Sequence, residues 1–380
     1  MKLLSLELTN YRPFKHQLID FNRDGVIGII GRNKKRGEIN MERKLSRRKF
    51  LRNTAIGSAA VGLMSSLSDS ALWGVPPPPP LIPIERRPLG KTGEKVTILG
   101  LGGVFLVQNI GFADAVAIVN KAIDLGINYI DTAAQYGEGE SERRVGEVMK
   151  TRRKEVFLAT KVLMRTKGEA EAQFENSLRN LQTDHVDLLQ IHAINTMSEL
   201  EQVLGADGSL EAALEAKAAG KTRFIGITGH SRYWVLTEAL KRFPFDTVLC
   251  PLSAADHNLL SFEQFLPVAE EQKVGLIGMK VLGEGRLVSL GVENCLRYTL
   301  SLPISVAILG MNSVKEVEEN VDIAKRFAPM NAQEKAEFRS QAQPFGNAGT
   351  LWWKANVWDE PTKAVTPKAK RVSVWVKIKE

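Results

Sequence analysis

The chain has 380 residues, of which 44% are hydrophobic and 25% are charged, as in an ordinary globular protein. Residues 1–49 hold 13 Lys and Arg and 5 Asp and Glu, so they carry the whole net charge of +8. The rest of the chain has as many acidic as basic residues, which argues against a nucleic-acid partner. Cys250 and Cys295 lie in no Cys/His cluster, which argues against a zinc or iron–sulfur site; we expect two small buried side chains rather than a disulfide.

Residues 1–40 contain alternating apolar runs that end in GIIGRNKKRG. The segment resembles the start of ATPases of the structural-maintenance-of-chromosomes and exonuclease-subunit type, in which a strand pair leads into a phosphate-binding loop. Such a loop ends in Gly-Lys-Ser/Thr, whose side chains bind phosphate and magnesium, and these residues are missing here. We therefore expect no ATP site. We interpret residues 1–40 as an extraneous, fusion-like segment ahead of a native start at Met41.

Residues 41–75 have the layout of a signal peptide, with a basic start and a modest apolar stretch at 54–67. The sequence SRRKFL, at 46–51, resembles the twin-arginine export signal. This resemblance implies a periplasmic or envelope location if translation starts at Met41, and a cytoplasmic location otherwise. A membrane span needs about 20 apolar residues, so we expect none here. A run of five prolines then makes residues 76–84 a stiff linker.

From residue 85 to residue 330, short apolar runs alternate with segments whose apolar residues recur at helical spacing. The runs are rich in Val, Ile and Leu, which is typical of parallel strands buried on both faces. We expect strands at 96–102, 128–131, 156–161, 186–192, 224–228, 247–251, 275–281 and 306–309. We expect helices at 113–125, 141–150, 170–181, 210–219, 233–243, 262–272, 292–300 and 314–327. One more helix is expected at 332–343, in an otherwise irregular tail that spans 331–380.

Eight strand-then-helix units predict an α/β fold, namely a (β/α)8 TIM barrel over 85–330. The N-terminal extension is expected to be disordered or loosely attached, and a small hairpin at 88–98 to close one end of the barrel. The alternative, a doubly wound sheet, normally has Gly-x-Gly-x-x-Gly between its first strand and helix. GLGGVFL, at 100–106, is a poor match because no helix is expected to begin at its glycines.

Polar side chains lie at or just after the ends of three expected strands: Asp131 with Tyr136, then Lys161, then His192. In a barrel these strand ends share one face, where the four side chains can converge. A tyrosine hydroxyl protonates a carbonyl oxygen only if its pKa, normally about 10, is brought nearer to neutral, and a neighbouring ammonium does this. A carboxylate keeps that ammonium charged, and a neutral imidazole orients the carbonyl group. The hydride must come from a nicotinamide cofactor.

Three motifs at these positions resemble the aldo-keto reductase family: DTAAQYG at 131–137, ATKV at 159–162 and DLLQIH at 187–192. The resemblance implies a barrel that reduces carbonyl groups with NAD(P)H and without a metal. It implies that Tyr136 is the general acid, that Lys161 lowers the pKa of Tyr136 and that Asp131 pairs with Lys161. His192 would orient a small-molecule carbonyl substrate. Taken singly, Tyr136 is compatible with an aromatic residue of a surface loop and His192 is more often structural, but the four residues together favour catalysis.

The same resemblance implies cofactor contacts after several strands and on the last helix of the barrel. These positions are Gly103, Val104, Thr228, Gly229, Met279, Leu282, Gly283, Gly310, Glu319 and Asn320. The chain departs from the family at two of the nicotinamide contacts. The Ser-Asn pair that binds the carboxamide reads Thr228-Gly229, and the aromatic residue that stacks on the ring is Met279.

A third departure concerns the adenosine end of the cofactor. In the family, a Lys-Ser pair and an Arg four residues further on bind the 2′-phosphate of NADP, and here these positions are Gly310, Met311 and Glu316. A carboxylate at the arginine position repels a phosphate, which favours NAD over NADP, although Lys315 or Arg286 can compensate.

Two functions are compatible with these residues. The first is an NAD(P)H-dependent oxidoreductase that reduces an aldehyde or ketone. The second is a barrel that retains its cofactor and acts as a redox sensor or a structural subunit. Neither the substrate nor the oligomeric state follows from the sequence. The intact Tyr-Lys-Asp-His set favours the first function, and the altered nicotinamide contacts leave room for the second.

Overall fold

The structure, a computed structural model, describes residues 5–9, 16–21, 26–31, 45–46, 82–257, 262–347 and 349–357. The chain divides into two compact units, Met1–Pro79 and Pro80–Glu380. Most of the expected signal segment, the run of prolines and the Lys-rich end of the chain lie outside the described residues. None of the helices in the described part of the chain has the length and apolar character needed to cross a bilayer.

The first unit contains an antiparallel sheet with the strand order β1-β2-β3-β4. Its strands are β1 (Ser5–Thr9), β2 (His16–Phe21), β3 (Val26–Gly31) and β4 (Leu45–Ser46). The strand β3 ends inside the GIIGRN motif, and the residues between β3 and β4 lie outside the described ranges.

The second unit is built on a closed barrel of eight parallel strands, in which the last strand pairs with the first. The strands are β7 (Leu99–Gly102), β8 (Tyr129–Asp131), β9 (Phe157–Val162), β10 (Val186–Ile191), β11 (Thr222–Thr228), β12 (Thr247–Pro251), β13 (Gly275–Met279) and β14 (Val306–Leu309). The predicted (β/α)8 barrel is therefore confirmed. Nearly every residue of these strands is buried, which explains their continuous apolar sequences.

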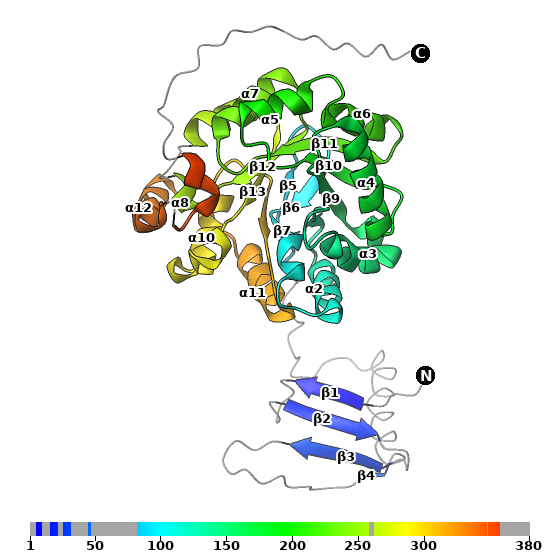
Figure 1. Cartoon of the computed structure of the whole chain (residues 1–380). Coiled ribbons are helices and arrows are strands. Elements are labelled where there is room, and N and C mark those ends of the chain that lie inside the picture. Colours follow the sequence, from blue (N-terminus) through cyan, green and yellow to red (C-terminus); the bar gives the residue numbers. More distant parts are fainter. Residues whose placement is uncertain are drawn as a thin grey trace, which may run out of the picture. The chain divides into compact units, whose positions relative to one another are not determined.

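Helices surround the barrel, as Figure 1 shows. They are α2 (Phe112–Asp124), α3 (Glu140–Arg152), α4 (Lys167–Leu181), α5 (Met197–Leu204), α6 (Ser209–Ala218), α7 (Tyr233–Arg242), α8 (Ala254–His257), α9 (Phe265–Glu271), α10 (Val292–Leu300), α11 (Val314–Lys325) and α12 (Ala332–Ala342). In α2 the buried residues are Ala115, Ile118, Val119, Ala122 and Ile123, the spacing that puts one apolar face on the barrel.

Short 3-10 helices occupy several connections. They are η1 (Gly103–Val107), η2 (Arg153–Glu155), η3 (Phe262–Gln264), η4 (Gly283–Gly285), η5 (Val288–Leu290), η6 (Gln343–Phe345) and η7 (Trp352–Val357).

The structure corrects four of the expected elements. The run at 96–102 is two strands, β6 (Lys95–Thr97) and β7, because the chain bends at Ile98, whose backbone nitrogen donates to Glu85. A helix, η1, does begin at the glycines of GLGGVFL, and the helix expected at 262–272 is η3 followed by α9. We did not expect α5, although Thr196 and Glu199 form the capping box that marks its start.

The expected hairpin is present and closes the N-terminal end of the barrel. Its strands β5 (Arg86–Pro88) and β6 pair antiparallel. Leu89, in the turn, is fully buried in one apolar cluster with inward-facing strand residues such as Tyr129 and Leu188. Gly90 follows with φ +54°, and a Cβ atom on it would lie 2.2 Å from the backbone nitrogen of Gly275, the first residue of β13. The turn is therefore packed directly against a strand start.

This packing predicts different effects for two alanine substitutions in one hairpin. Gly93 also has a positive φ, +80°, but nothing lies within 4 Å of a Cβ atom there. A left-handed conformation costs a residue with Cβ about 1–2 kcal/mol, so Gly93→Ala should lower the free energy of unfolding by that amount. Gly90→Ala should cost about 1–3 kcal/mol more because of overpacking. Urea denaturation measures both, and equal losses would contradict the packing of Gly90 on β13.

Candidate active site

Lys161, on β9, is the centre of a buried polar cluster at the C-terminal end of the barrel. Its Nζ donates to Oδ1 of Asp131, to the carbonyl oxygen of Thr132 at 2.7 Å and to Oη of Tyr136 at 3.1 Å. Lys161 and Asp131 are each 1% exposed. The structure therefore brings three of the four expected residues into direct contact, from the ends of β8 and β9 and the loop after β8.

The alternation of side chains along each strand explains why these residues meet. Every second residue of a strand points into the barrel. In β8 these inward-facing residues are Tyr129 and Asp131, and in β9 they are Phe157, Ala159 and Lys161. In the parallel register, Asp131 lies beside Ala159 and Lys161 lies beside Gln190. The inward-facing residues nearer the strand starts, Tyr129, Phe157 and Ala159, belong to the apolar cluster inside the barrel. The polar residues are consequently the last inward-facing layer before the strands end.

Gln190 is a member of the cluster that the sequence analysis did not single out. Its Nε2 donates to Oδ2 of Asp131 at 2.9 Å, so both carboxylate oxygens of Asp131 have a partner. An amide at an inward-facing position of a strand was the available signal, since a buried amide needs a hydrogen-bond partner. Gln190 therefore holds Asp131, which in turn holds Lys161.

The charges in this cluster depend on burial as much as on neighbours. Burial has the largest effect on the pKa of Lys161 and lowers it, but attraction to Asp131 and Tyr136 outweighs burial, and the pKa is raised. Burial has the largest effect on the pKa of Tyr136 and raises it; the ammonium of Lys161 lowers this pKa and the carboxylate of Asp131 raises it, so the pKa is raised overall. Lys161 acts in the expected direction, but the net shift is upward, contrary to our expectation. The phenol is therefore protonated and the amine charged at neutral pH.

His192 follows β10 and lies beside Tyr136, with ring centroids 6.1 Å apart in an edge-to-face arrangement. It is 2% exposed, and its Nδ1 has no hydrogen-bond partner among the described residues. Burial, followed by repulsion from Lys161, lowers the pKa of His192 well below 6.5. The imidazole is therefore neutral at physiological pH.

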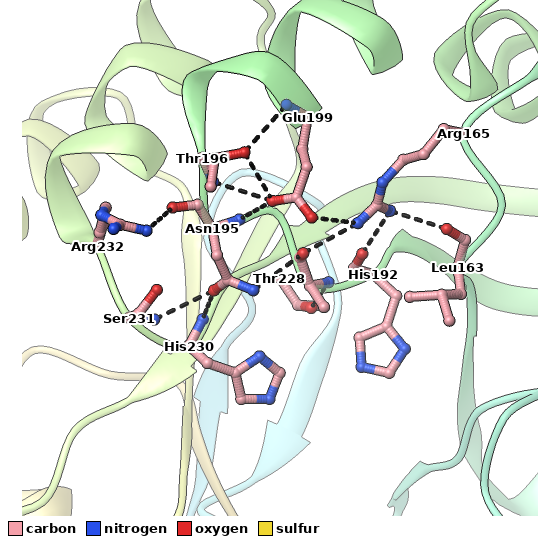
Figure 2. Close-up of polar contacts among 11 residues, drawn as sticks. Leu163, Arg165, His192, Asn195, Thr196, Glu199, Thr228, His230, Ser231 and Arg232 are labelled. Carbon is pink, nitrogen blue, oxygen red and sulfur yellow. Dashed lines mark hydrogen bonds and ion pairs between the residues drawn. The ribbon is translucent and has the colours of Figure 1, made fainter. Parts of the chain in front are cut away.

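A second polar network, drawn in Figure 2, fixes the loops that carry His192. Arg165, after β9, donates to the carbonyl oxygens of Leu163 at 2.9 Å, His192 at 2.7 Å and Ala193 at 3.0 Å. The same guanidinium reaches Glu199 on α5 at 3.3 Å. Sequence reasoning missed Arg165, because a guanidinium that binds backbone carbonyls requires no particular partner residues.

Most of the expected cofactor positions lie at or just after the C-terminal ends of strands, but the side chains of two are not free. Thr228 is fully buried, and its hydroxyl accepts a hydrogen bond from Ala193 at 2.8 Å. A Cβ atom on Gly229 would meet the carbonyl oxygen of Ile194 at 2.7 Å. Met279 ends β13 and is 8% exposed. The positions of the Ser-Asn pair thus offer no amide.

The remaining positions differ in exposure. Gly103 is buried and Val104 partly buried in η1, Glu319 is exposed on α11, and Asn320 on the same helix is buried.

The loop after β13 holds the expected pyrophosphate positions and has an unusual backbone. Lys280, Gly283, Glu284 and Gly285 all have positive φ angles, of +56°, +54°, +54° and +91°. The backbone nitrogens of Gly283, Gly285 and Arg286 donate to carbonyl oxygens within the loop, those of Lys280, Leu282 and Gly283 respectively. A Cβ atom on Gly285 would meet nothing within 4 Å, so this backbone is open. Leu282 and Gly283 lie in this loop, and their contact with the diphosphate of a dinucleotide stays a prediction.

The C-terminal helix η7 packs on the loops after β12 and β13. Nε1 of Trp353 donates to Oδ1 of Asp256 at 3.1 Å, and Nε1 of Trp352 donates to Oε2 of Glu284 at 2.7 Å. Nζ of Lys280 lies 4.4 Å from the centre of the Trp353 ring, a cation–π distance. The tail thus holds the loop after β13 from a point more than 60 residues further along the chain.

The buried ion pair predicts a large stability effect. Lys161→Met leaves the carboxylate of Asp131 buried without its cation, which should lower the free energy of unfolding by about 3–5 kcal/mol. Adding Asp131→Leu should restore part of this loss. Lys150→Met is the control, because Lys150 pairs with Glu147 at 47% and 41% exposure, and such pairs contribute about 1 kcal/mol or less. Equal losses on urea denaturation of the two single variants would show that the buried pair is not stabilising.

Comparison with known proteins agrees with this geometry. The model of the aldo/keto reductase family matches residues 98–294, which include all four expected catalytic residues. L-galactose dehydrogenase from Arabidopsis thaliana is 31% identical over 323 residues, which cover 72% of this chain and 98% of the relative. The solved holo form of aldo-keto reductase AKR11C1 from Bacillus halodurans is 27% identical, with a TM-score of 0.60 over 68% of this chain and 96% of its own.

A likeness in fold extends to more distant structures. An aldo-keto reductase from Klebsiella pneumoniae, solved in complex with NADPH, is 22% identical, with a TM-score of 0.57 over 69% of this chain and 96% of its own. The family match spans half of the chain, and L-galactose dehydrogenase is covered almost completely. The chain therefore belongs to the aldo/keto reductase family.

Proposed function

We propose that the second unit reduces the carbonyl group of an aldehyde or ketone with NAD(P)H, with Tyr136 as the general acid. The observation that carries this proposal is the position of Tyr136 Oη, 3.1 Å from Nζ of Lys161, which is itself bound to Asp131. A bound nicotinamide nucleotide supplies the hydride. Membership in the aldo/keto reductase family supports this class of reaction.

Each residue of the cluster has a distinct part in the proposed reaction. The hydroxyl of Tyr136 donates its proton to the carbonyl oxygen while the carbonyl carbon is reduced, and the product is an alcohol. The phenolate that remains lies against the ammonium of Lys161, which stabilises the negative charge. Asp131 keeps that ammonium in place. The neutral imidazole of His192 donates an N–H to the carbonyl oxygen and so orients it towards Tyr136.

Removal of one hydroxyl tests this assignment. Tyr136→Phe should lower kcat for reduction of a panel of aldehydes by at least about 100-fold, while the affinity for NAD(P)H stays unchanged. Tyr129→Phe is the matched control, because that buried hydroxyl has no hydrogen-bond partner among the described residues. Because burial raises the pKa of Tyr136 above 10.0, the acid is lost only when the pH rises past that value, and kcat should be constant through neutral pH. Full activity of Tyr136→Phe would overturn the assignment.

We further propose that the nucleotide is NAD rather than NADP. A Cβ atom on Gly310 would lie 1.9 Å from Cδ2 of Phe105, so the ring of Phe105 leaves no room for a lysine there. The carboxylate of Glu316 accepts a hydrogen bond from the backbone nitrogen of Asn312 at 2.7 Å and is held at the start of α11. Nearby, Lys315 is paired with Glu319. These contacts support a site that repels a 2′-phosphate.

Nucleotide affinities measured by calorimetry test the cofactor preference. The wild-type chain should bind NADH more tightly than NADPH, and Glu316→Gln should raise the affinity for NADPH by about fivefold, the effect of removing one exposed repulsive charge. Glu318→Gln is the control on the same helix, because Glu318 pairs with Lys121 on α2 at 3.1 Å. Tighter binding of NADPH by the wild-type chain would contradict the preference.

A further inference from the structure

A second histidine lies beside His192 at the C-terminal end of the barrel. His230 follows β11, as His192 follows β10, and the two ring centroids are 6.1 Å apart. In Figure 2 both rings lie on the same side of the polar network, away from Glu199. His230 is thus placed next to the group that is proposed to orient the carbonyl, although the proposed mechanism gives it no part.

The backbone of His230 is held by an amide from the neighbouring loop. Oδ1 of Asn195 accepts hydrogen bonds from the backbone nitrogens of His230 at 2.7 Å and Ser231 at 3.2 Å. Nδ2 of Asn195 donates to the carbonyl oxygen of Ala193 at 3.1 Å. Both ends of this amide therefore serve the backbone. Asn195 fixes the backbone of His230 through its amide oxygen, while Nδ2 keeps a second N–H besides the one that it donates to Ala193.

The ring of His230, by contrast, has no hydrogen-bond partner among the described residues. Burial, followed by repulsion from Lys280 and Lys161, lowers the pKa of His230 to about 3. The ring is therefore a neutral imidazole with one N–H donor and one nitrogen acceptor. A partly buried polar group without a partner costs stability, and a ligand that pairs with it recovers that cost.

Hydride transfer restricts what that ligand can be. The carbonyl group must lie within hydrogen-bond distance of Tyr136 and His192, and the donor carbon of the nicotinamide must approach its carbon to about 3–3.5 Å. The carboxamide is attached to the ring carbon next to that donor carbon, so it also lies near this end of the barrel. It carries one acceptor and one donor group. At the end of β11, Thr228 is bonded to backbone and Gly229 has no side chain.

We propose that His230 binds the carboxamide of the nicotinamide ring, at a position where the strand itself offers no side-chain amide. This inference rests on the proposed function, because it requires that a nicotinamide nucleotide binds. Asn195 is then a positioning residue, since it holds the backbone of His230.

A nucleotide that lacks the nicotinamide separates this contact from the rest of the site. Calorimetry on the full chain would compare NAD+ with ADP-ribose, and NADP+ with 2′-phospho-ADP-ribose. His230→Ala should weaken binding of the preferred dinucleotide by about tenfold, the effect of one hydrogen bond, and leave the matching ADP-ribose unchanged. His230→Asn, which keeps a donor and an acceptor, should recover part of the loss. His185→Ala, an exposed histidine that contacts Asp184, should change neither affinity.

The possible results distinguish this inference from the proposed function. Unchanged dinucleotide affinity in His230→Ala, with a raised KM for the carbonyl compound, would place His230 on the substrate and overturn the inference alone. Equal weakening of dinucleotide and ADP-ribose would show a general disturbance and also overturn it. A wild-type chain that binds none of the four nucleotides would overturn both proposals.

Discussion

The ion pair between Lys161 and Asp131 is the interaction on which the site depends. Both groups are almost completely buried, and two charges removed from water are stable only when each is paired and hydrogen-bonded. The carbonyl oxygen of Thr132 and the amide of Gln190 meet this requirement. The position of Tyr136 follows, because its hydroxyl takes the third donor of the same ammonium. The arrangement therefore needs the exact register of β8, β9 and β10.

Much of this arrangement could be predicted from the sequence, since strands buried on both faces must be apolar and a polar residue at their ends is conspicuous. Other features could not be predicted, for physical reasons. Arg165 binds backbone carbonyls, which every sequence has, so no pattern of neighbouring residues marks it. The upward pKa shift of Tyr136 comes mainly from burial, which depends on the closed barrel rather than on the adjacent lysine. The helix α5 was missed although its capping box is visible at Thr196 and Glu199.

Two glycines show how distant side chains decide what a position can hold. Gly229 is crowded by the carbonyl oxygen of Ile194, and Gly310 is covered by the ring of Phe105, more than 200 residues earlier. In the sequence, each of them reads only as a departure from a family motif. In the structure, a neighbouring group already occupies the space that a side chain at each glycine would fill.

The packing of η7 on the loop after β13 has a consequence for the order of assembly. The barrel closes when β14 pairs with β7, but Trp352 and Trp353 reach Glu284 and Asp256 only from beyond the last barrel helix. During synthesis all eight strands of the barrel are therefore available before the residues that secure the loop after β13. A nascent chain can complete its scaffold first, and the contacts of η7 with Glu284 and Asp256 form only after Trp353 has left the ribosome.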